Sequence, residues 1–333
     1  MMAFVGRRLA AVVLQVLLVT FIAYALFFVV STATGATPEQ RVAGRTATPE
    51  QVARVAQLLG TDRPIYEQYL RFLGGVAQGD FGYSFAYRQP VSNLLFPAAG
   101  VTAALVGLAA VLWMALAIPL GLAGALRVGS RLDRLLTAIT QFGISAPVFW
   151  VAPMLVYFLA FQPSQGMFLG IDLGRSVTVF PLQGYVEFAK SPLEWLRHLL
   201  LPALALSIGF AAFYARFVRA LVREQLDKEY VLVARAKGLS TAGLVRHHIG
   251  PVVAPAMIIL LGLDVGATLG GALFVEQTFG LPGIGFLAVS SIRNLDYPMT
   301  VGAITLAALM AVLVNMVADL VQAAIDPRVR RTA

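Results

Sequence analysis

Six long apolar stretches divide this chain of 333 residues. A helix of about 20 apolar residues crosses the roughly 30 Å of hydrocarbon in a bilayer, and each stretch has that length. Segments between them carry most of the charged residues. We therefore predict an all-α membrane protein with one transmembrane domain over residues 1–333. Its six predicted spans cover residues 9–30, 101–126, 135–161, 199–218, 252–274 and 299–325.

The first stretch follows Arg7 and Arg8, so a cleaved signal peptide is the alternative interpretation. The apolar region of a signal peptide covers about 7 to 15 residues. This stretch covers 22, from Leu9 to Val30, and we therefore predict a retained helix.

Positive charge indicates which side of the membrane each connecting segment occupies, because cytoplasmic loops are rich in Lys and Arg. With the N-terminus inside, the inner segments hold 15 Lys and Arg residues and the outer segments hold 10. The outer segments also hold 10 Asp and Glu residues, which balance that charge. Both termini are predicted to be cytoplasmic.

The outer segment 31–99 is long enough for a small folded cap between spans one and two. Pro49 follows Thr48 directly, and Gln51 lies three residues after Thr48. This is the pattern of a capped helix start. An apolar helical stripe follows it. The second outer segment, 162–198, is rich in Gly and Pro, and we expect irregular structure there.

Composition supports the membrane assignment, since 59% of the residues are apolar and 13% are charged. Soluble domains are about 25% charged. The net charge of +8 could indicate nucleic-acid binding, but the inner loops already account for the excess, and no nucleic acid is expected. The absence of cysteine excludes disulfides, thiolate metal sites and cysteine nucleophiles.

The inner segment, residues 216–250, has the pattern of a charged helix that continues the fourth span. Its apolar stripe ends at Tyr230. The pattern then restarts, and Gly238 is expected to end one short helix while Ser240 caps the next.

Small residues in this segment, Ala234, Ala236 and Gly238, would let a backbone approach another surface closely, while Arg235 and Lys237 supply charge. That is the chemistry of a docking site. An ordinary solvated loop is the alternative, and the pattern alone does not decide between them.

Several stretches, taken in order, resemble the permease subunits of ABC importers in their dipeptide and oligopeptide form. The inner segment contains A-R-A-K-G-L-S, then R-H-H-I and Pro251. The cap contains L-G-T-D-R-P-I-Y-E-Q-Y-L and G-D-F-G-Y-S-F-A-Y-R-Q-P-V. Span three carries A-P-V-F-W, span five ends in V-E-Q-T-F-G-L-P-G-I-G, and the tail is D-L-V-Q-A-A-I-D-P-R-V-R.

This resemblance implies a type I ABC importer permease of the bacterial inner membrane, which imports di- or oligopeptides by alternating access. It implies four kinds of partner: a distinct homologous permease, two cytoplasmic ATP-binding subunits, an external solute-binding protein and the peptide. The inner segment would hold two coupling helices that insert into the ATPase. The residues it assigns to that contact are Tyr230, Ala234, Arg235, Ala236, Lys237, Gly238, His248 and Pro251.

The sequence departs from the family pattern at two places. Leu232 and Val233 stand where importers usually begin the loop motif with Glu-Ala, and Ser31 to Gly35 replaces a Pro-Gly-Asp turn after span one. The first departure concerns the residues that would contact the ATPase. The second concerns the shape of the backbone where the first span ends.

No phosphate-binding G-x-x-x-x-G-K-[ST] loop occurs in the chain. ATP and Mg²⁺ are therefore expected on the partner subunits, and this chain is expected to be a non-catalytic subunit without a cofactor. No metal site is expected either, because the adjacent His247 and His248 diverge on a helix and His198 lies on the other side of the membrane.

Two carboxylates, Asp264 and Asp319, lie within predicted spans, where a buried charge is costly. Gly262, Gly266 and Gly270 form a small-residue stripe for close helix packing. Asp264 is about 200° from that stripe and shares a face with Thr268. These two residues would line the translocation path, or Asp264 would make a buried interhelical hydrogen bond.

Between spans five and six, Glu276, Pro282, Gly283 and Gly285 are candidates for an outer gate or a docking surface for the binding protein. The alternative is a tight turn. Other functions stay open: an importer of another solute, such as a nickel chelate or an oligosaccharide, an ion-driven secondary transporter that uses Asp264 and Asp319, or a membrane scaffold. No inverted repeat is apparent, which disfavours the secondary transporter.

Overall fold

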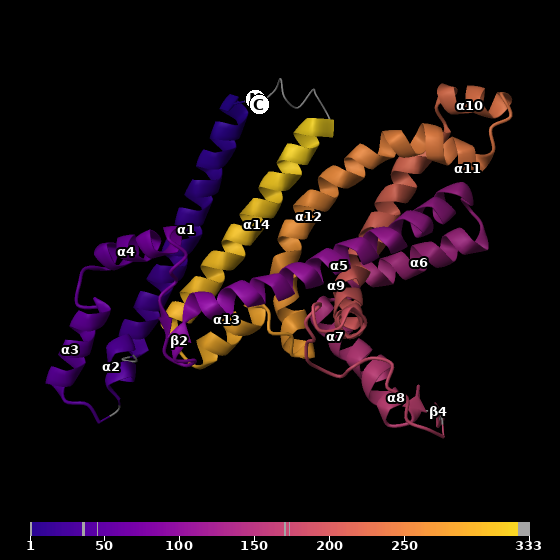
Figure 1. Cartoon of the computed structure of the whole chain (residues 1–333). Coiled ribbons are helices and arrows are strands. Elements are labelled where there is room, and N and C mark those ends of the chain that lie inside the picture. The colour runs from indigo at the N-terminus through magenta and orange to yellow at the C-terminus, as the bar shows by residue number, and fades with distance from the viewer. Residues whose placement is uncertain (1, 35–36, 45, 170, 173, 326–333) are drawn as a thin grey trace. The chain divides into compact units, whose positions relative to one another are not determined.

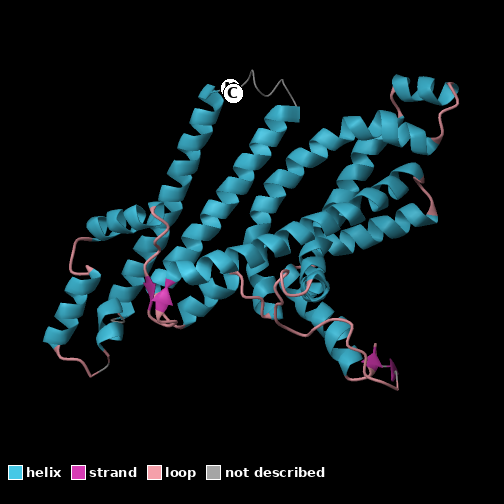
Figure 2. Ribbon diagram, viewed as in Figure 1, coloured by secondary structure: helices cyan, strands magenta, loops and turns pink. Residues whose placement is uncertain are grey.

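The computed structural model describes residues 2–34, 37–44, 46–169, 171–172 and 174–325. Helices form most of this chain (Figure 1, Figure 2). Its internal contacts define two compact units, Met1–Val101 with Gly283–Val312 and Thr102–Pro282 with Leu313–Ala333. Helices α5 (Val91–Leu126) and α14 (Tyr297–Ile325) each contribute to both units. The units are described in turn.

The first unit contains one long helix, a set of short helices and a small hairpin. These are α1 (Met2–Thr34), α2 (Pro38–Ala43), α3 (Pro49–Leu59), α4 (Ile65–Ala77), β1 (Tyr83–Ser84) paired with β2 (Gln89–Pro90), and α13 (Ile284–Arg293). The predicted start of α3 is confirmed. Thr48 Oγ1 accepts from the Gln51 amide at 3.4 Å, and Gln51 Oε1 accepts from the Thr48 amide at 2.9 Å.

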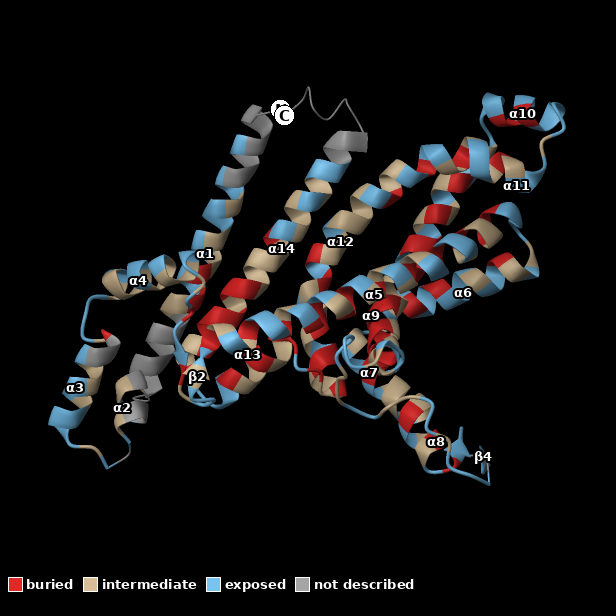
Figure 3. Cartoon of the chain, viewed as in Figure 1, coloured by how far each residue is buried: buried red, intermediate tan, exposed pale blue. Residues whose placement is uncertain are grey.

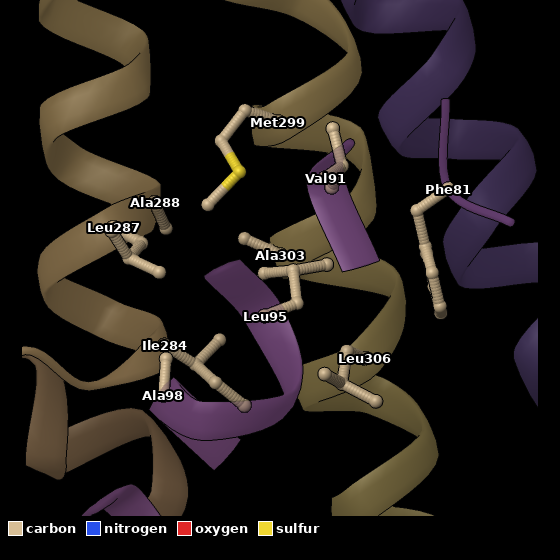
Figure 4. Packing of buried hydrophobic residues seen from close by; sticks show 10 residues of the cluster. All are labelled: Phe81, Val91, Leu95, Ala98, Ile284, Leu287, Ala288, Met299, Ala303 and Leu306. Atoms are coloured by element: carbon tan, nitrogen blue, oxygen red, sulfur yellow. The ribbon is translucent and has the colours of Figure 1, made fainter. Parts of the chain in front are cut away.

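The core of the first unit joins the start of α5 to α13 and α14. Figure 4 shows the side chains that meet there: Phe81, Val91, Leu95, Ala98, Ile284, Leu287, Ala288, Met299, Ala303 and Leu306. The glycine at position 302 lets the helices approach, because a Cβ on Gly302 would lie 3.0 Å from Val91 Cγ1. Burial of this apolar surface is the main force that holds the unit together.

The second unit contains the remaining helices and a second hairpin. They are α6 (Arg131–Ser145), α7 (Val148–Leu155), α8 (Gln162–Ser164), β3 (Met167–Phe168) paired with β4 (Ile171–Asp172), α9 (Pro192–Leu226), α10 (Glu229–Ala236), α11 (Thr241–Leu244) and α12 (Gly250–Phe279). Wider π-helical turns, η1 (Val156–Phe161) and η2 (Val245–Ile249), continue α7 and α11. The predicted charged extension of the fourth span is confirmed, since α9 continues unbroken to Leu226.

The third predicted span is not a straight helix. Between α6 and α7 the chain bends by 106°. Pro147 causes the break: it has no amide hydrogen to donate, and it disfavours helical geometry at Ala146, which is extended with φ −83° and ψ 112°. The prediction of one continuous span over residues 135–161 was therefore wrong in shape.

Four described helices are long and apolar enough to cross a membrane, and the bent α6–α7 pair makes a fifth if it counts as one span. Figure 3 shows exposed residues along these helices. Many of the exposed residues are apolar, such as Val111 in α5 and Phe142 in α6. Lipid or a protein partner would cover such a surface. Five of the six predicted spans fall within single helices, and the third covers the bent α6–α7 pair. The six-span arrangement, the sidedness of the termini and the external location of the cap stay predictions.

Candidate functional site

The inner segment folds as two short helical pieces at the end of α9, as the sequence predicts. Helix α10 ends at Ala236, and the backbone reverses at Gly238, whose φ of +83° is a left-handed conformation that favours glycine. Ser240 then caps α11, because its Oγ accepts from the Gly243 amide at 3.2 Å. Tyr230 does not extend the stripe of α9. It lies in α10 and donates its phenol hydrogen to Gln225 Oε1 at 2.9 Å.

The small residues of α10 differ in their surroundings. Ala234 packs inward with Val231, and both are buried, whereas Ala236 and Gly238 are exposed. Arg235 and Lys237 are also exposed, as expected for charge offered to a partner. A close backbone approach by another protein is therefore open at Ala236 and Gly238.

The exposed face of α10 is apolar in a way that the sequence pattern did not indicate. Leu232 is 56% exposed, Val233 is 55% exposed and Tyr230 is 38% exposed. Leu232 and Val233 are the residues that depart from the family pattern. The sequence does show two adjacent aliphatic residues on a charged helix. Their exposure could not be known without the orientation of α10.

A shallow groove of about 470 Å³ lies beside this face, and it brings residues of α10 together with one of η2. It is lined by Glu229, Tyr230, Val233, Ala234, Lys237, Leu239 and His248. The ring nitrogen Nδ1 of His248 is buried, with no hydrogen-bond partner among the described residues. Pro251 is exposed in the first turn of α12 and does not line the groove.

The inner segment is anchored to the rest of the second unit through α9. Close packing against α5 and α6 depends on glycines: a Cβ on Gly121 would lie 2.6 Å from the Ala215 carbonyl oxygen, and one on Gly143 would lie 2.8 Å from Ala212 Cβ. Arg216 also donates to Gln141 Oε1 at 2.9 Å. Helix α9 is therefore in close contact with both α5 and α6.

Asp264 makes an interhelical hydrogen bond, which is one of the two alternatives that the sequence leaves open. The buried phenol of Tyr214 in α9 donates to Asp264 Oδ2 at 2.7 Å. Thr268 is buried and donates to the Asp264 carbonyl oxygen of its own helix. The two residues share one face of α12, as predicted. A role in translocation stays a prediction, and Tyr214 is a partner that spacing alone could not identify.

The glycine stripe of α12 packs where the sequence places it, on a different face from Asp264. A Cβ on Gly262 would collide with Ala318 of α14, and one on Gly266 would collide with the Asn315 side chain. Gly270 has no atom within 4 Å of its Cβ position. Asp319 lies half-buried in α14, close to these contacts in sequence.

Glu276 is fully buried near the end of α12, where Thr102 Oγ1 donates to its Oε1 at 2.6 Å. The chain then turns at Gly280, which has a φ of +61°, and Gly283 precedes α13. Pro282 is exposed, Gly283 is buried and Gly285 lies in the first turn of α13. The ten-residue helix after the turn is regular, so the irregular backbone is limited to the turn itself.

No three His, Cys, Asp or Glu side chains within the described ranges lie close enough together to hold a metal ion. The groove, the polar pair in α9 and α12, and the buried Glu276 are polar features of the second unit. None of them has the arrangement of a nucleophile, a base and an oxyanion site that acyl transfer needs.

Two family models match the chain. The model of the binding-protein-dependent transport system inner membrane component covers residues 117–331, and the model of its N-terminal part covers residues 1–106. A match over residues 117–331 includes the bent third span, the inner segment and α12.

Curated relatives agree with these matches. A probable peptide ABC transporter permease of Sinorhizobium fredii is 32% identical over 88% of this chain and 89% of its own length. A putative peptide permease of Brucella suis is 35% identical over 82% of each chain. The dipeptide transport system permease DppB of Escherichia coli is 30% identical over 99% of each chain.

A solved structure supports the fold. A chain of the MetNI methionine ABC transporter, in an inward-facing conformation, superposes with a TM-score of 0.52 and 16% identity over 70% of this chain and 96% of its own. This likeness bears on the fold alone. The family models and the relatives show that the chain belongs to the family of inner-membrane permease components of binding-protein-dependent ABC transporters, in its dipeptide and oligopeptide form.

Proposed function

We propose that this chain is the permease subunit of an ATP-driven importer that moves di- or oligopeptides by alternating access. It would act with a distinct homologous permease, two cytoplasmic ATPase subunits and an external solute-binding protein. ATP and Mg²⁺ would be bound by the ATPase subunits, so this chain would take part in no chemical step. Its task is to change shape when the ATPases close.

One observation carries this proposal: an exposed apolar face beside a groove, on a short helix that is firmly anchored. Tyr230, Leu232 and Val233 form the face, and Lys237 lies beside it. An apolar surface ringed by charge is typical of a protein–protein contact. Because α9 packs closely on α5 and α6, a force on α10 would reach those helices.

The peptide substrate rests on the names of the relatives and on the family resemblance. A nickel chelate or an oligosaccharide is the alternative within the same class of importer. The external binding protein would select the substrate in each case, and its identity would therefore distinguish these alternatives. An ion-driven mechanism is separated by a direct comparison: uptake that fails on ATP depletion and survives a proton uncoupler supports the proposal, and the reverse result contradicts it.

Gly238→Arg tests the docking surface. The position is exposed, with no atom within 4 Å of a Cβ there, so the arginine would project into the space that a partner must enter. We expect the complex to assemble in the membrane, while peptide-stimulated ATP hydrolysis and uptake fall at least tenfold.

Gly238→Ala is the matched control, because it introduces the same left-handed strain without the bulk. It is expected to retain most of the uptake. If Gly238→Arg transports normally, or if both variants fail equally, the inner segment is not the docking surface.

A further inference from the structure

One cavity in the first unit lies far in sequence from the inner segment. It has a volume of about 590 Å³ and is partly open, and its lining comes from α1, α2, the turn after α3, α4, the residues around β1 and the start of α14. Small-molecule sites in proteins have volumes of about 300 to 1,000 Å³. The size is therefore that of a binding site for a small solute.

Charges of both signs line this cavity. Arg71 supplies a guanidinium, and Glu39 and Asp80 supply carboxylates. Glu39 Oε2 accepts from Thr61 Oγ1 at 3.2 Å, and Asp80 Oδ1 accepts from the Gly82 amide at 2.8 Å. In the part of the chain that the structure describes, no ion pair joins any of these three side chains to an opposite charge. Both signs of charge are available to a ligand.

The remaining wall is largely aromatic. Tyr24, Phe72, Phe81 and Tyr297 contribute rings to it. Tyr24 is held in place, since its phenol donates to Gln68 Oε1 at 3.0 Å. Such a wall accepts an apolar side chain, while the charged groups fix the orientation of a ligand.

One detail indicates that the site accepts a polar occupant. The hydroxyl of Thr37 is buried in the cavity wall, with no hydrogen-bond partner among the described residues. A buried hydroxyl without a partner is unfavourable unless a ligand or water satisfies it.

We propose that this cavity binds a zwitterionic peptide of two or three residues. The peptide carboxylate would lie on the Arg71 fork, the ammonium group would lie near the carboxylates of Asp80 and Glu39, and one side chain would enter the aromatic wall. Arginine pairs with a carboxylate through two parallel hydrogen bonds, which fits this arrangement. A lipid chain would leave three charged groups without partners, and a neutral sugar would not use them.

This inference rests on the proposed peptide importer and adds a peptide site within the permease itself. The test uses the complete membrane complex in nanodiscs. The solute-binding protein is left out, so that any peptide that binds is bound by the membrane complex itself. Binding of radiolabelled alanylphenylalanine is compared with binding of its C-terminal amide, which lacks the carboxylate.

We expect the wild type to bind the free acid about tenfold more tightly than the amide, because a charge-assisted hydrogen bond contributes roughly that factor. Arg71→Gln is expected to bind both forms equally and weakly. Asp80→Asn tests the ammonium end of the site in the same way, by comparing the free peptide with its N-acetylated form, which lacks the ammonium group. The variant is expected to bind both forms equally and weakly. Arg63→Gln is the matched control, since Arg63 is exposed, pairs with Glu67 at 3.6 Å and does not line the cavity.

Uptake with the solute-binding protein present is measured on the same complexes after reconstitution into sealed proteoliposomes. If the wild type imports peptide but binds none without that protein, the cavity proposal is overturned and the proposed function stands. If no preparation imports peptide, the proposed function itself fails. A phospholipid that copurifies with the wild type and is lost from Arg71→Gln would identify a lipid site and would also overturn the peptide proposal.

Discussion

Arg219 and Asp133 form a two-pronged ion pair between α9 and α6. Arg219 Nε lies 2.9 Å from Asp133 Oδ1, and Arg219 Nη2 donates to Asp133 Oδ2 at 2.9 Å. The carboxylate is further held by the Gly129 amide at 3.0 Å, and its side chain is 7% exposed. The pair fixes the charged extension of α9 to the start of the helix that bends at Pro147. It therefore links the inner segment to the third predicted span.

Arg219→Ala is expected to lower the thermal midpoint clearly, because it leaves the carboxylate of Asp133 without its cation. Replacing both residues removes that unpaired charge. The double variant Asp133→Ala with Arg219→Ala should therefore cost less than the sum of the single variants. Thermal unfolding of the purified chain in detergent measures all three.

Arg197→Ala is the control for this cycle. Its pair with Glu194 has the same distance of 2.9 Å, but the two side chains are 44% and 41% exposed. Exposed pairs contribute about 0 to 1 kcal/mol. A loss of stability at Arg219 no larger than at Arg197 would show that the pair does not anchor α9.

The glycine stripe of α12 gives a second prediction. Gly262→Ala and Gly266→Ala should each lower the thermal midpoint clearly, because the added methyl group collides with Ala318 or Asn315 of α14. Gly270→Ala belongs to the same stripe but meets no atom within 4 Å, so it is expected to be neutral. Equal behaviour of all three variants would show that α12 and α14 do not pack through these residues.

Much of the local structure could be predicted from the sequence because it depends on neighbouring residues. The cap at Thr48, the turn at Gly238 and the helix start at Ser240 are each determined within about one helical turn. The break before α7 is also local, and Pro147 was a sufficient signal for it. The break was not predicted, because the span was inferred from the hydropathy of the whole apolar stretch.

The candidate sites depended on contacts between distant segments, and the sequence could not supply those. Periodicity placed Asp264 away from the glycine stripe, but Tyr214 is 50 residues earlier in the chain. The same holds for Glu276 and Thr102, which are separated by 174 residues. Helix α13 was missed because its ten residues are too short for a span and follow a Gly-rich turn.

Asp264→Asn tests the proposed role of that carboxylate in the translocation path. The variant keeps the shape and still accepts a hydrogen bond from Tyr214, but it removes the charge. We expect slower peptide uptake with little change in stability. Tyr214→Phe is the comparison, and it should lower stability by about 1 kcal/mol because it removes one hydrogen bond. Uptake kinetics and a pH profile that match the wild type in Asp264→Asn would leave Asp264 with a structural role alone.

Asp296 joins the hairpin after the cap helices to the start of α14, and its removal should be costly. Its side chain accepts from Ser84 Oγ at 2.5 Å, from the Ala86 amide at 3.0 Å and from the Met299 amide at 3.4 Å, and it is buried. Asp296→Ala is expected to cost about 3 kcal/mol, since several buried donors would lose their acceptor at once. Ser92→Ala breaks one neutral hydrogen bond nearby, to the Gly79 carbonyl oxygen at 2.7 Å, and should cost about 1 kcal/mol. Thermal unfolding of the two variants measures the difference, and equal losses would mean that Asp296 does not organise this junction.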